Sequence, residues 1–180
     1  MVSVSLFFQI IIQFWQIIVV RIIPNASGSD FGIIFVVLMV AQSVASAIAP
    51  KAAAKTNVVI TGCAVGLVFA TSALALLPQN NALITVGELA GILFVARLWM
   101  VLGSVQLHII FPEALRATCD SAVSTLVRLL LVCVMPLSGY CLDKFGPLSL
   151  SVLAWMVAIL YISIMHRYRA RMVMVEDRIV

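Results

Sequence analysis

The chain has 180 residues, of which 64% are apolar and 10% are charged, with a net charge of +4 and a mean hydropathy of +1.21. A soluble domain carries roughly 25% charged residues, so a water-soluble enzyme of this size is excluded. The same composition excludes a disordered chain, and the scattered positive charge argues against nucleic-acid binding. We therefore expect a protein that lies mostly in lipid.

Six apolar segments follow one another along the chain, each about as long as a helix needs to cross a hydrocarbon core roughly 30 Å thick. Polar, turn-forming stretches such as 24–30 and 78–81 separate them. Continuous runs of this length favour helices over the alternating strands of a membrane barrel. We predict an all-α membrane protein with one six-helix domain, its spans at about 4–23, 31–50, 58–77, 85–110, 118–141 and 147–166, and a basic tail at 167–180.

The first segment is not typical of a secretory signal peptide, because no basic region precedes it and three glutamines interrupt it. We expect it to remain as a membrane span. The cysteines lie within or at the ends of the apolar segments and lack Cys-x-x-Cys spacing, so we expect small buried residues rather than metal ligands or disulfides. They are Cys63, Cys119, Cys133 and Cys141. The sequence predicts no metal and no cofactor.

The positions of lysine and arginine predict the orientation. With six crossings, both termini share one side of the membrane. That side carries seven of the eleven basic residues, namely Lys51, Lys55, Arg116, Arg167, Arg169, Arg171 and Arg178, and the opposite side carries Arg21 and Lys144. Because cytoplasmic loops carry the excess of positive charge, we expect a multi-pass protein with both termini in the cytoplasm. We expect the plasma membrane, with an organelle membrane as the alternative.

Amide side chains form a stripe along the first helix. Gln9, Gln13 and Gln16, with Ser5, fall within an arc of roughly 80°, while the rest of that helix is apolar. Such a stripe indicates either a polar conduit or hydrogen bonding between helices. The second helix carries a weaker stripe that includes Gln42.

Arginines occur inside two predicted spans, although one near the bilayer centre costs roughly 2.5–3.5 kcal/mol on insertion scales. Arg97 lies within roughly 40° of Ser104 and His108 on the fourth helix. Arg128 shares a face of the fifth helix with Thr125. The alternative for Arg128 is a side chain that extends to the cytoplasmic end of its helix.

Glu88 is the acidic residue inside the fourth predicted span. It lies nine residues before Arg97, close to the opposite face, so a straight helix gives no ion pair between them. Glu88 must find another partner, become protonated, or lie near the wet outer interface. The third and sixth segments carry only small polar residues, which indicates helices outside the polar part of the bundle.

Two stretches near the fifth segment resemble the major facilitator superfamily of transporters. The stretch 111–118, followed by Arg128, is similar to the cytoplasmic acid–Pro–x–x–x–Arg junction of its sugar and organic-ion porter branches. Pro112, Glu113 and Arg116 occupy the matching places, although Glu113 follows the proline where the family's acid precedes it. The stretch 136–146 resembles the family's exterior G-x-x-x-D-x-x-G turn, with matching residues at Gly139, Asp143 and Gly146.

A weaker likeness at 47–62 falls at the place of the family's signature loop, whose Gly and Asp are missing here. That loss is more usual in the C-terminal half, so the chain resembles the C-terminal six-helix half of a twelve-helix carrier. The first helix begins near Met1 without a basic leader, which favours a truncated form. The resemblance implies a partner: an N-terminal half or a second copy.

The resemblance implies secondary active transport of a small polar or organic solute by alternating access. The first, second, fourth and fifth helices would line the cavity, and the third and sixth would stand outside. An arginine there would favour an anionic group, and Glu88 or His108 would carry a coupling proton. The cavity candidates are Gln9, Gln13, Gln16, Gln42, Arg97, Ser104, His108, Thr125 and Arg128.

Two other classes of function compete with a carrier. A non-transporting membrane scaffold or assembly partner would bury the polar stripes against another protein. An intramembrane enzyme is less favoured, because no span offers a Ser–His pair with supporting glycines. We therefore expect no enzymatic activity.

Overall fold

The computed structural model describes residues 2–23, 25–52, 56–76, 82–110, 112–146, 148–160 and 163. These residues form six helices and no strand, which confirms the all-α prediction. The helices are α1 (Val2–Ile22), α2 (Gly28–Ala52), α3 (Thr56–Leu76), α4 (Ala82–Ile110), α5 (Glu113–Phe145) and a sixth helix at Leu148–Leu160. The predicted basic tail at 167–180 lies outside the described residues.

Four helices contain a stretch long and apolar enough to cross a bilayer: Val2–Arg21, Gly28–Ala52, Ala82–Val105 and Glu113–Phe145. The apolar stretches of α3 and of the sixth helix are shorter, at Ile60–Ser72 and Leu148–Leu160. The described residues thus give four helices of spanning length where the sequence predicted six. Four such helices are compatible with a multi-pass membrane protein.

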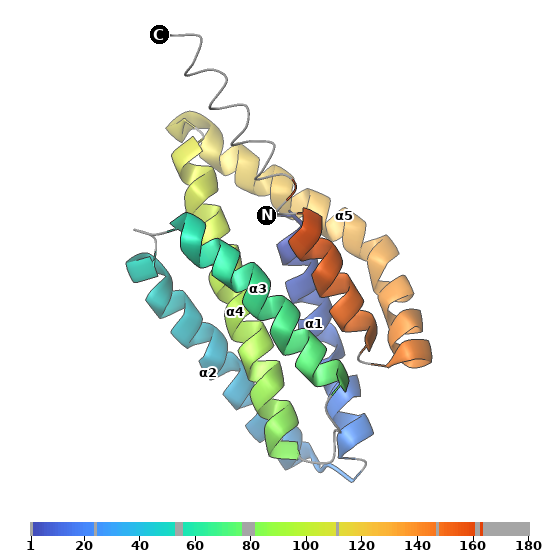
Figure 1. The fold of residues 1–180 in the computed structure, drawn as a ribbon. Helices are drawn as coiled ribbons and strands as arrows, with labels where there is room; N and C mark the ends of the chain where they lie inside the picture. Colours follow the sequence, from blue (N-terminus) through green and yellow to red (C-terminus); the bar gives the residue numbers. More distant parts are fainter. Residues whose placement is uncertain are drawn as a thin grey trace.

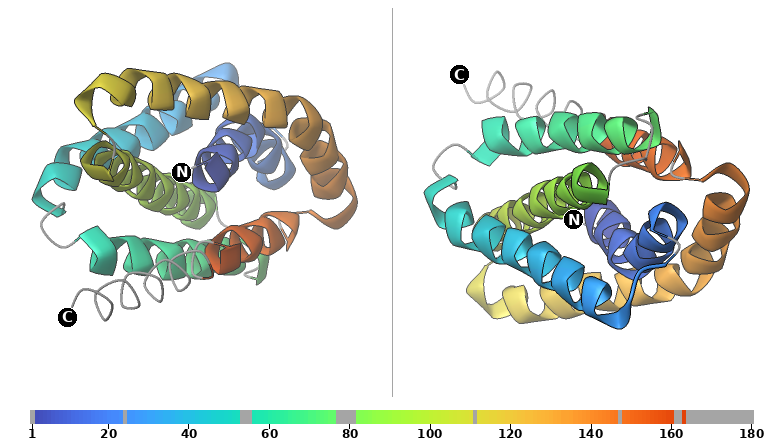
Figure 2. Two further views of the ribbon diagram at one scale, coloured as in Figure 1. Left: turned by 90° about the horizontal axis from the view of Figure 1, so that it is seen from above. Right: turned by 90° about the horizontal axis from the view of Figure 1, so that it is seen from below.

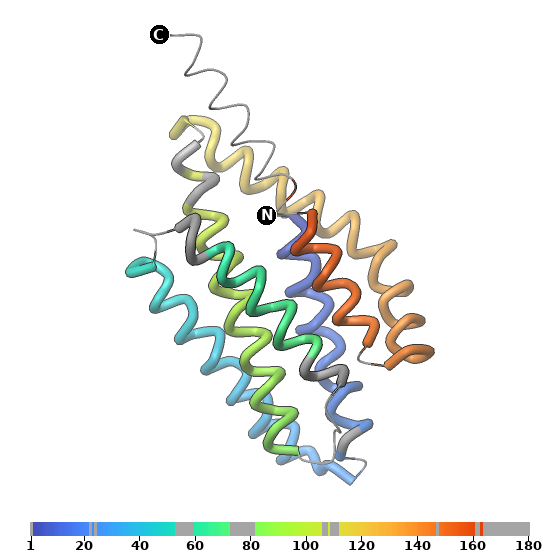
Figure 3. Tube along the Cα trace, viewed as in Figure 1, coloured from blue at the N-terminus to red at the C-terminus, as the bar shows by residue number. Residues whose placement is uncertain are grey.

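Successive helices run in opposite directions (Figure 1, Figure 3). Seen along the bundle, α1 and α4 lie in the middle, with α3 and the sixth helix on one side and α2 and α5 on the other (Figure 2). Helix α4 packs against α1, α2 and α3, whereas α5 packs mainly against α1. The fold therefore has three layers, and the middle one carries the apolar core.

The largest share of the buried core comes from α1 and α4, and α2, α3 and the sixth helix pack buried side chains against it. Phe7, Ile10 and Ile11 on α1 and Leu93 and Leu102 on α4 are completely buried. In lipid such contacts stabilise the bundle by close packing rather than by removal of apolar surface from water. Helix α5 is packed less tightly than the other long helices, since its buried residues are Val127 and Leu142.

The helix ends follow the local sequence. Ser27 and Asp30 cap the start of α2, since the Ser27 N–H donates to Asp30 Oδ2 at 2.8 Å and the Asp30 N–H to Ser27 Oγ at 3.4 Å. Pro112 immediately precedes α5, and Gly146 ends it with a φ of 63°. Glu113–Arg116, expected between two helices, instead form the first turn of α5. Proline here starts the helix rather than opening a loop.

The sixth helix is attached to α3 by a buried hydrogen bond. Ser151 Oγ donates to the carbonyl oxygen of Thr71 at 2.6 Å, and both side chains are buried. Trp155 Nε1 donates to Ser72 Oγ at 3.4 Å. These contacts hold the two helices together on the same side of the bundle (Figure 2).

Candidate functional site

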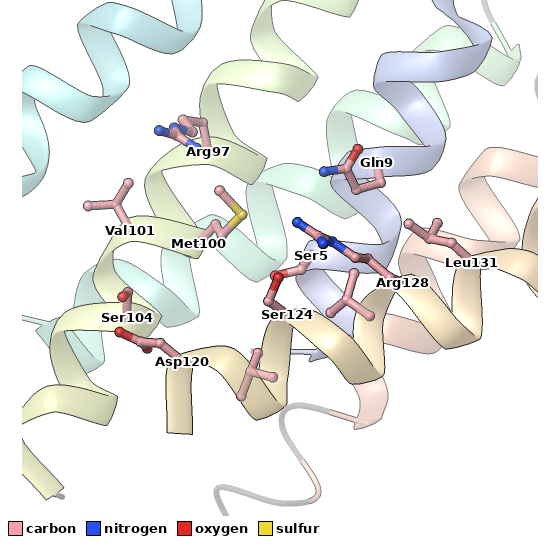
Figure 4. A pocket seen from close by; sticks show the side chains of 12 residues that line it. Ser5, Gln9, Arg97, Met100, Val101, Ser104, Asp120, Ser124, Arg128 and Leu131 are labelled. Carbon is pink, nitrogen blue, oxygen red and sulfur yellow. The ribbon is translucent and has the colours of Figure 1, made fainter. Parts of the chain in front are cut away.

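A pocket of about 460 Å³ opens between α1, α4 and α5 (Figure 4). That volume falls in the range of roughly 300–1,000 Å³ that small-molecule sites occupy. Twelve residues line it: Ser5 and Gln9 from α1, Arg97, Met100, Val101 and Ser104 from α4, and Asp120, Val123, Ser124, Val127, Arg128 and Leu131 from α5. Its lining therefore combines apolar side chains with amide, hydroxyl and charged groups.

Two arginines line this pocket from neighbouring helices. Arg97 is the sixteenth residue of the 29-residue α4, and Arg128 is the sixteenth residue of the 33-residue α5. Both therefore lie about 22 Å along the helix from its first residue, at 1.5 Å per residue. This mid-helix position argues against the alternative that Arg128 simply reaches the end of its helix.

The two guanidinium groups differ in their contacts. Arg97 Nε donates a hydrogen bond to Ser46 Oγ on α2 at 3.1 Å. Arg128 extends from α5 into the pocket toward Gln9 (Figure 4), and its guanidinium makes no hydrogen bond to any described residue. Within the described part of the chain, neither arginine has a carboxylate partner. The pocket lining thus contains two positive charges, neither of which pairs directly with a carboxylate among the described residues.

Asp120 supplies the carboxylate of the pocket lining. Its Oδ2 lies 2.9 Å from His108 Nε2, and both side chains are partly exposed, at 46% and 42%. This contact joins the last turns of α4 to the first turns of α5. Asp120 is therefore held by a histidine that lies outside the lining.

Asp120 and Ser124 were not among the residues predicted from the sequence. Thr125 was predicted to share the cavity with Arg128, but it lies outside the lining. Asp120, Ser124 and Arg128 recur every four residues, so they fall on one helical face. That spacing is the signal in the sequence that would have found them.

The glutamine stripe divides between the pocket and the surface. Gln9 lines the pocket together with Ser5, whereas Gln13 and Gln16 are exposed and outside the lining. Gln42 on α2 is half-buried and donates to the carbonyl oxygen of Leu38 in its own helix at 3.2 Å.

Of the α4 candidates, Arg97 and Ser104 line the pocket. His108 reaches it through Asp120. Glu88 is half-buried outside the lining, and it forms no ion pair with the described residues. The structure therefore brings Gln9, Arg97, Ser104 and Arg128 together out of the nine predicted cavity residues.

The two sequence motifs lie away from the pocket. Pro112 and Glu113 are exposed, and Glu113 Oε1 lies 3.9 Å from Arg116 Nη1. Asp143 forms an ion pair at 2.9 Å with Arg21 at the end of α1. Gly139 and Gly146, which flank Asp143, lie against Phe14 and Arg21 respectively. Arg21, the partner of Asp143, was not predicted from the sequence.

All four cysteines are free thiols. Cys63 is buried, Cys119 and Cys141 are half-buried, and Cys133 is exposed. Describing all four as buried was therefore wrong, because α5 turns Cys133 away from the core. No group of three His, Cys, Asp or Glu side chains suited to a metal ion occurs among the described residues.

The chain matches no known protein family, no curated protein and no solved structure.

Proposed function

We propose that the chain is one six-helix unit of a secondary active carrier that moves a small polar or organic solute by alternating access. The observation that carries this proposal is the polar pocket between α1, α4 and α5, with two mid-helix arginines that lack carboxylate partners within the described residues. Cations are costly in lipid. Arginines that stabilised only the bundle would be expected to bind a carboxylate, so a solute is the better explanation.

The origin of the lining residues supports the same proposal. The pocket is lined from α1, α4 and α5, and Arg97 also bonds to Ser46 of α2. Helix α3 and the sixth helix pack together on the other side of the middle layer (Figure 2). The major facilitator superfamily, to which the motifs at 111–118 and 136–146 are similar, divides its helices in this way.

In the proposed mechanism, the solute binds between this unit and a second six-helix unit. Rocking of one unit against the other would open the pocket to each side of the membrane in turn. The partner would be an N-terminal half or a second copy, and it would cover exposed polar side chains such as Gln13, Gln16 and Thr125. The termini would face the cytoplasm.

Reconstitution tests the carrier. The purified chain in phosphatidylcholine liposomes should take up one class of radiolabelled solute saturably, from a panel of a sugar, an amino acid, a dicarboxylate and an organic cation. Arg128→Gln should abolish that uptake while membrane insertion persists. Mass measurement of the detergent-solubilised chain should show a dimer if the second unit is another copy. A monomeric chain with no saturable uptake would contradict a carrier formed by this chain alone.

The sparse packing of α5 favours a second candidate, a non-transporting assembly partner. Helix α5 buries Val127 and Leu142 and leaves Ser121 and Thr125 exposed, as expected if it packs against another membrane protein. In that case crosslinking in native membranes should capture a stoichiometric partner, and added solute should not change its yield.

A further inference from the structure

We infer that the pocket between α1, α4 and α5 binds a small oxyanion, with Arg97 and Arg128 as the cationic groups of its lining. This inference rests on the proposed function, because it narrows the solute class of the same pocket. It goes beyond the presence of arginine in the sequence, since it depends on which charges the fold brings into one cavity.

The charges of the pocket lining favour an anion. The charged lining residues are Arg97, Arg128 and Asp120. The Asp120 carboxylate already has a partner in His108, whose Nε2 lies 2.9 Å away. The two guanidinium groups and the Asp120 carboxylate together give the lining a net charge of +1, which a bound anion would neutralise.

The N–H donors of the two guanidinium groups also suit an oxyanion. Guanidinium presents a planar set of N–H donors that matches carboxylate and phosphate oxygens, often with two parallel hydrogen bonds. Arg97 uses its Nε toward Ser46, and this bond leaves its terminal Nη groups for a ligand. Arg128 has all its donors available among the described residues and extends into the pocket (Figure 4).

Neutral donors complete the site. The amide of Gln9 and the hydroxyls of Ser5, Ser104 and Ser124 lie in the same lining. Each can donate a hydrogen bond to an anionic oxygen. A volume of about 460 Å³ admits a four-carbon dicarboxylate together with bridging water. The site thus has more hydrogen-bond donors than a small anion needs, and one carboxylate.

Asp120 then acts as a specificity-determining residue. Its carboxylate repels a bound anion, and the contact with His108 moderates that repulsion. Replacing this carboxylate by an amide should therefore strengthen anion binding. Loss of the Asp120 charge should raise the affinity for the anion, whereas loss of either arginine should lower it.

The same oxyanion chemistry is offered by a soluble carboxylate or phosphate and by the phosphate of an anionic lipid. We would place the full-length chain in nanodiscs of phosphatidylcholine and titrate succinate, inorganic phosphate or the neutral analogue succinamide by calorimetry. A parallel sample would contain phosphatidylglycerol, whose retention through purification would be measured by mass spectrometry. Binding of succinate or phosphate in neutral lipid identifies a soluble anion; arginine-dependent retention of phosphatidylglycerol alone identifies the lipid.

Arg97→Gln and Arg128→Gln should each weaken binding of the anion by about tenfold or more, because each removes a charge-assisted contact. Arg128→Lys should retain part of the affinity, and Asp120→Asn should increase it. Lys51→Gln is the matched control, since it removes one positive charge from an exposed side chain outside the pocket. Circular dichroism and thermal melting would verify that each variant keeps the helical fold.

The inference is overturned if the wild-type chain binds none of succinate, inorganic phosphate and phosphatidylglycerol. It is also overturned if both arginine variants bind these anions as well as the wild type does. It is also overturned if Lys51→Gln weakens binding as much as the pocket variants do. Failure of the carrier would look different. Arginine-dependent binding without any transport would leave the anion site standing, whereas transport of a neutral solute by both arginine variants would remove it and leave the carrier.

Discussion

Arg21 at the end of α1 binds Asp143 near the end of α5, with 2.9 Å between Nη2 and Oδ1. Its Nη1 also donates to the carbonyl oxygen of Leu142 at 2.9 Å. The guanidinium therefore connects two helices whose contacting residues are 122 positions apart in the sequence. It does so beside Gly146, where α5 ends with a positive φ.

We predict that Arg21→Gln lowers the free energy of unfolding by about 1 kcal/mol, because it removes an exposed ion pair and a hydrogen bond to a main-chain oxygen. Asp143→Asn should cost less, since it leaves the bond to Leu142 in place. Thermal melting of both single variants and of the double variant in detergent would measure the coupling. Strictly additive effects would show that the two side chains do not interact.

The α1–α5 contact could not be predicted from the sequence. Arg21 and Asp143 were assigned to the same side of the membrane, but nothing local pairs residues so far apart. The helices themselves were predictable, since six apolar runs of suitable length give six helices. The helix ends were harder to predict. Pro112 immediately precedes α5, and the residues from Glu113 onward, expected in a loop, belong to the helix.

The direction in which each polar stripe faces was the harder problem. Periodicity placed Gln9, Gln13 and Gln16 on one side of α1, yet only Gln9 lines the pocket. In a soluble helix the apolar face identifies the core, but lipid is as apolar as the core. Helix α1 accordingly buries Ile18 while exposing Ile17. Apolarity alone therefore cannot orient such a helix.

Gly139 allows a close approach between α5 and α1. A Cβ atom added there would lie 3.4 Å from Phe14 Cζ, which is tight but tolerable if the ring shifts slightly. We predict that Gly139→Ala has little effect, whereas Gly139→Leu destabilises the fold by about 1–3 kcal/mol through overpacking.

A compensating substitution would test this explanation. Phe14→Ala should recover part of the stability lost in Gly139→Leu, because it removes the ring that the leucine meets. Melting temperatures of the two single variants and the double variant would give the coupling energy. Absence of any recovery would mean that the glycine is needed for another reason.

The buried hydrogen bond between Ser151 and Thr71 should stabilise the attachment of the sixth helix. We predict that Ser151→Ala lowers stability by about 1 kcal/mol, since model helices in membranes gain roughly 1–2 kcal/mol from such bonds. Ser151→Val should cost more, because its larger side chain must also fit a buried site. Val152→Ala, at an exposed position on the same helix, is the matched control. Chemical or thermal unfolding in detergent would compare the three; equal losses for Ser151→Ala and Val152→Ala would contradict a specific role for the hydroxyl.

The contact between His108 and Asp120 should control anion binding in the pocket. His108→Ala removes the partner that lies 2.9 Å from the Asp120 carboxylate, so this carboxylate would be free to repel an anion or to pair with a pocket arginine. We predict that succinate binds His108→Ala about threefold more weakly than wild type, a modest change expected for partly exposed charges. In the Asp120→Asn background the same substitution should have no effect, because the charge through which it acts is gone. Calorimetry on the wild type, the two single variants and the double variant would complete this double-mutant cycle. If His108→Ala weakens binding equally in both backgrounds, the histidine acts on the anion directly and not through Asp120.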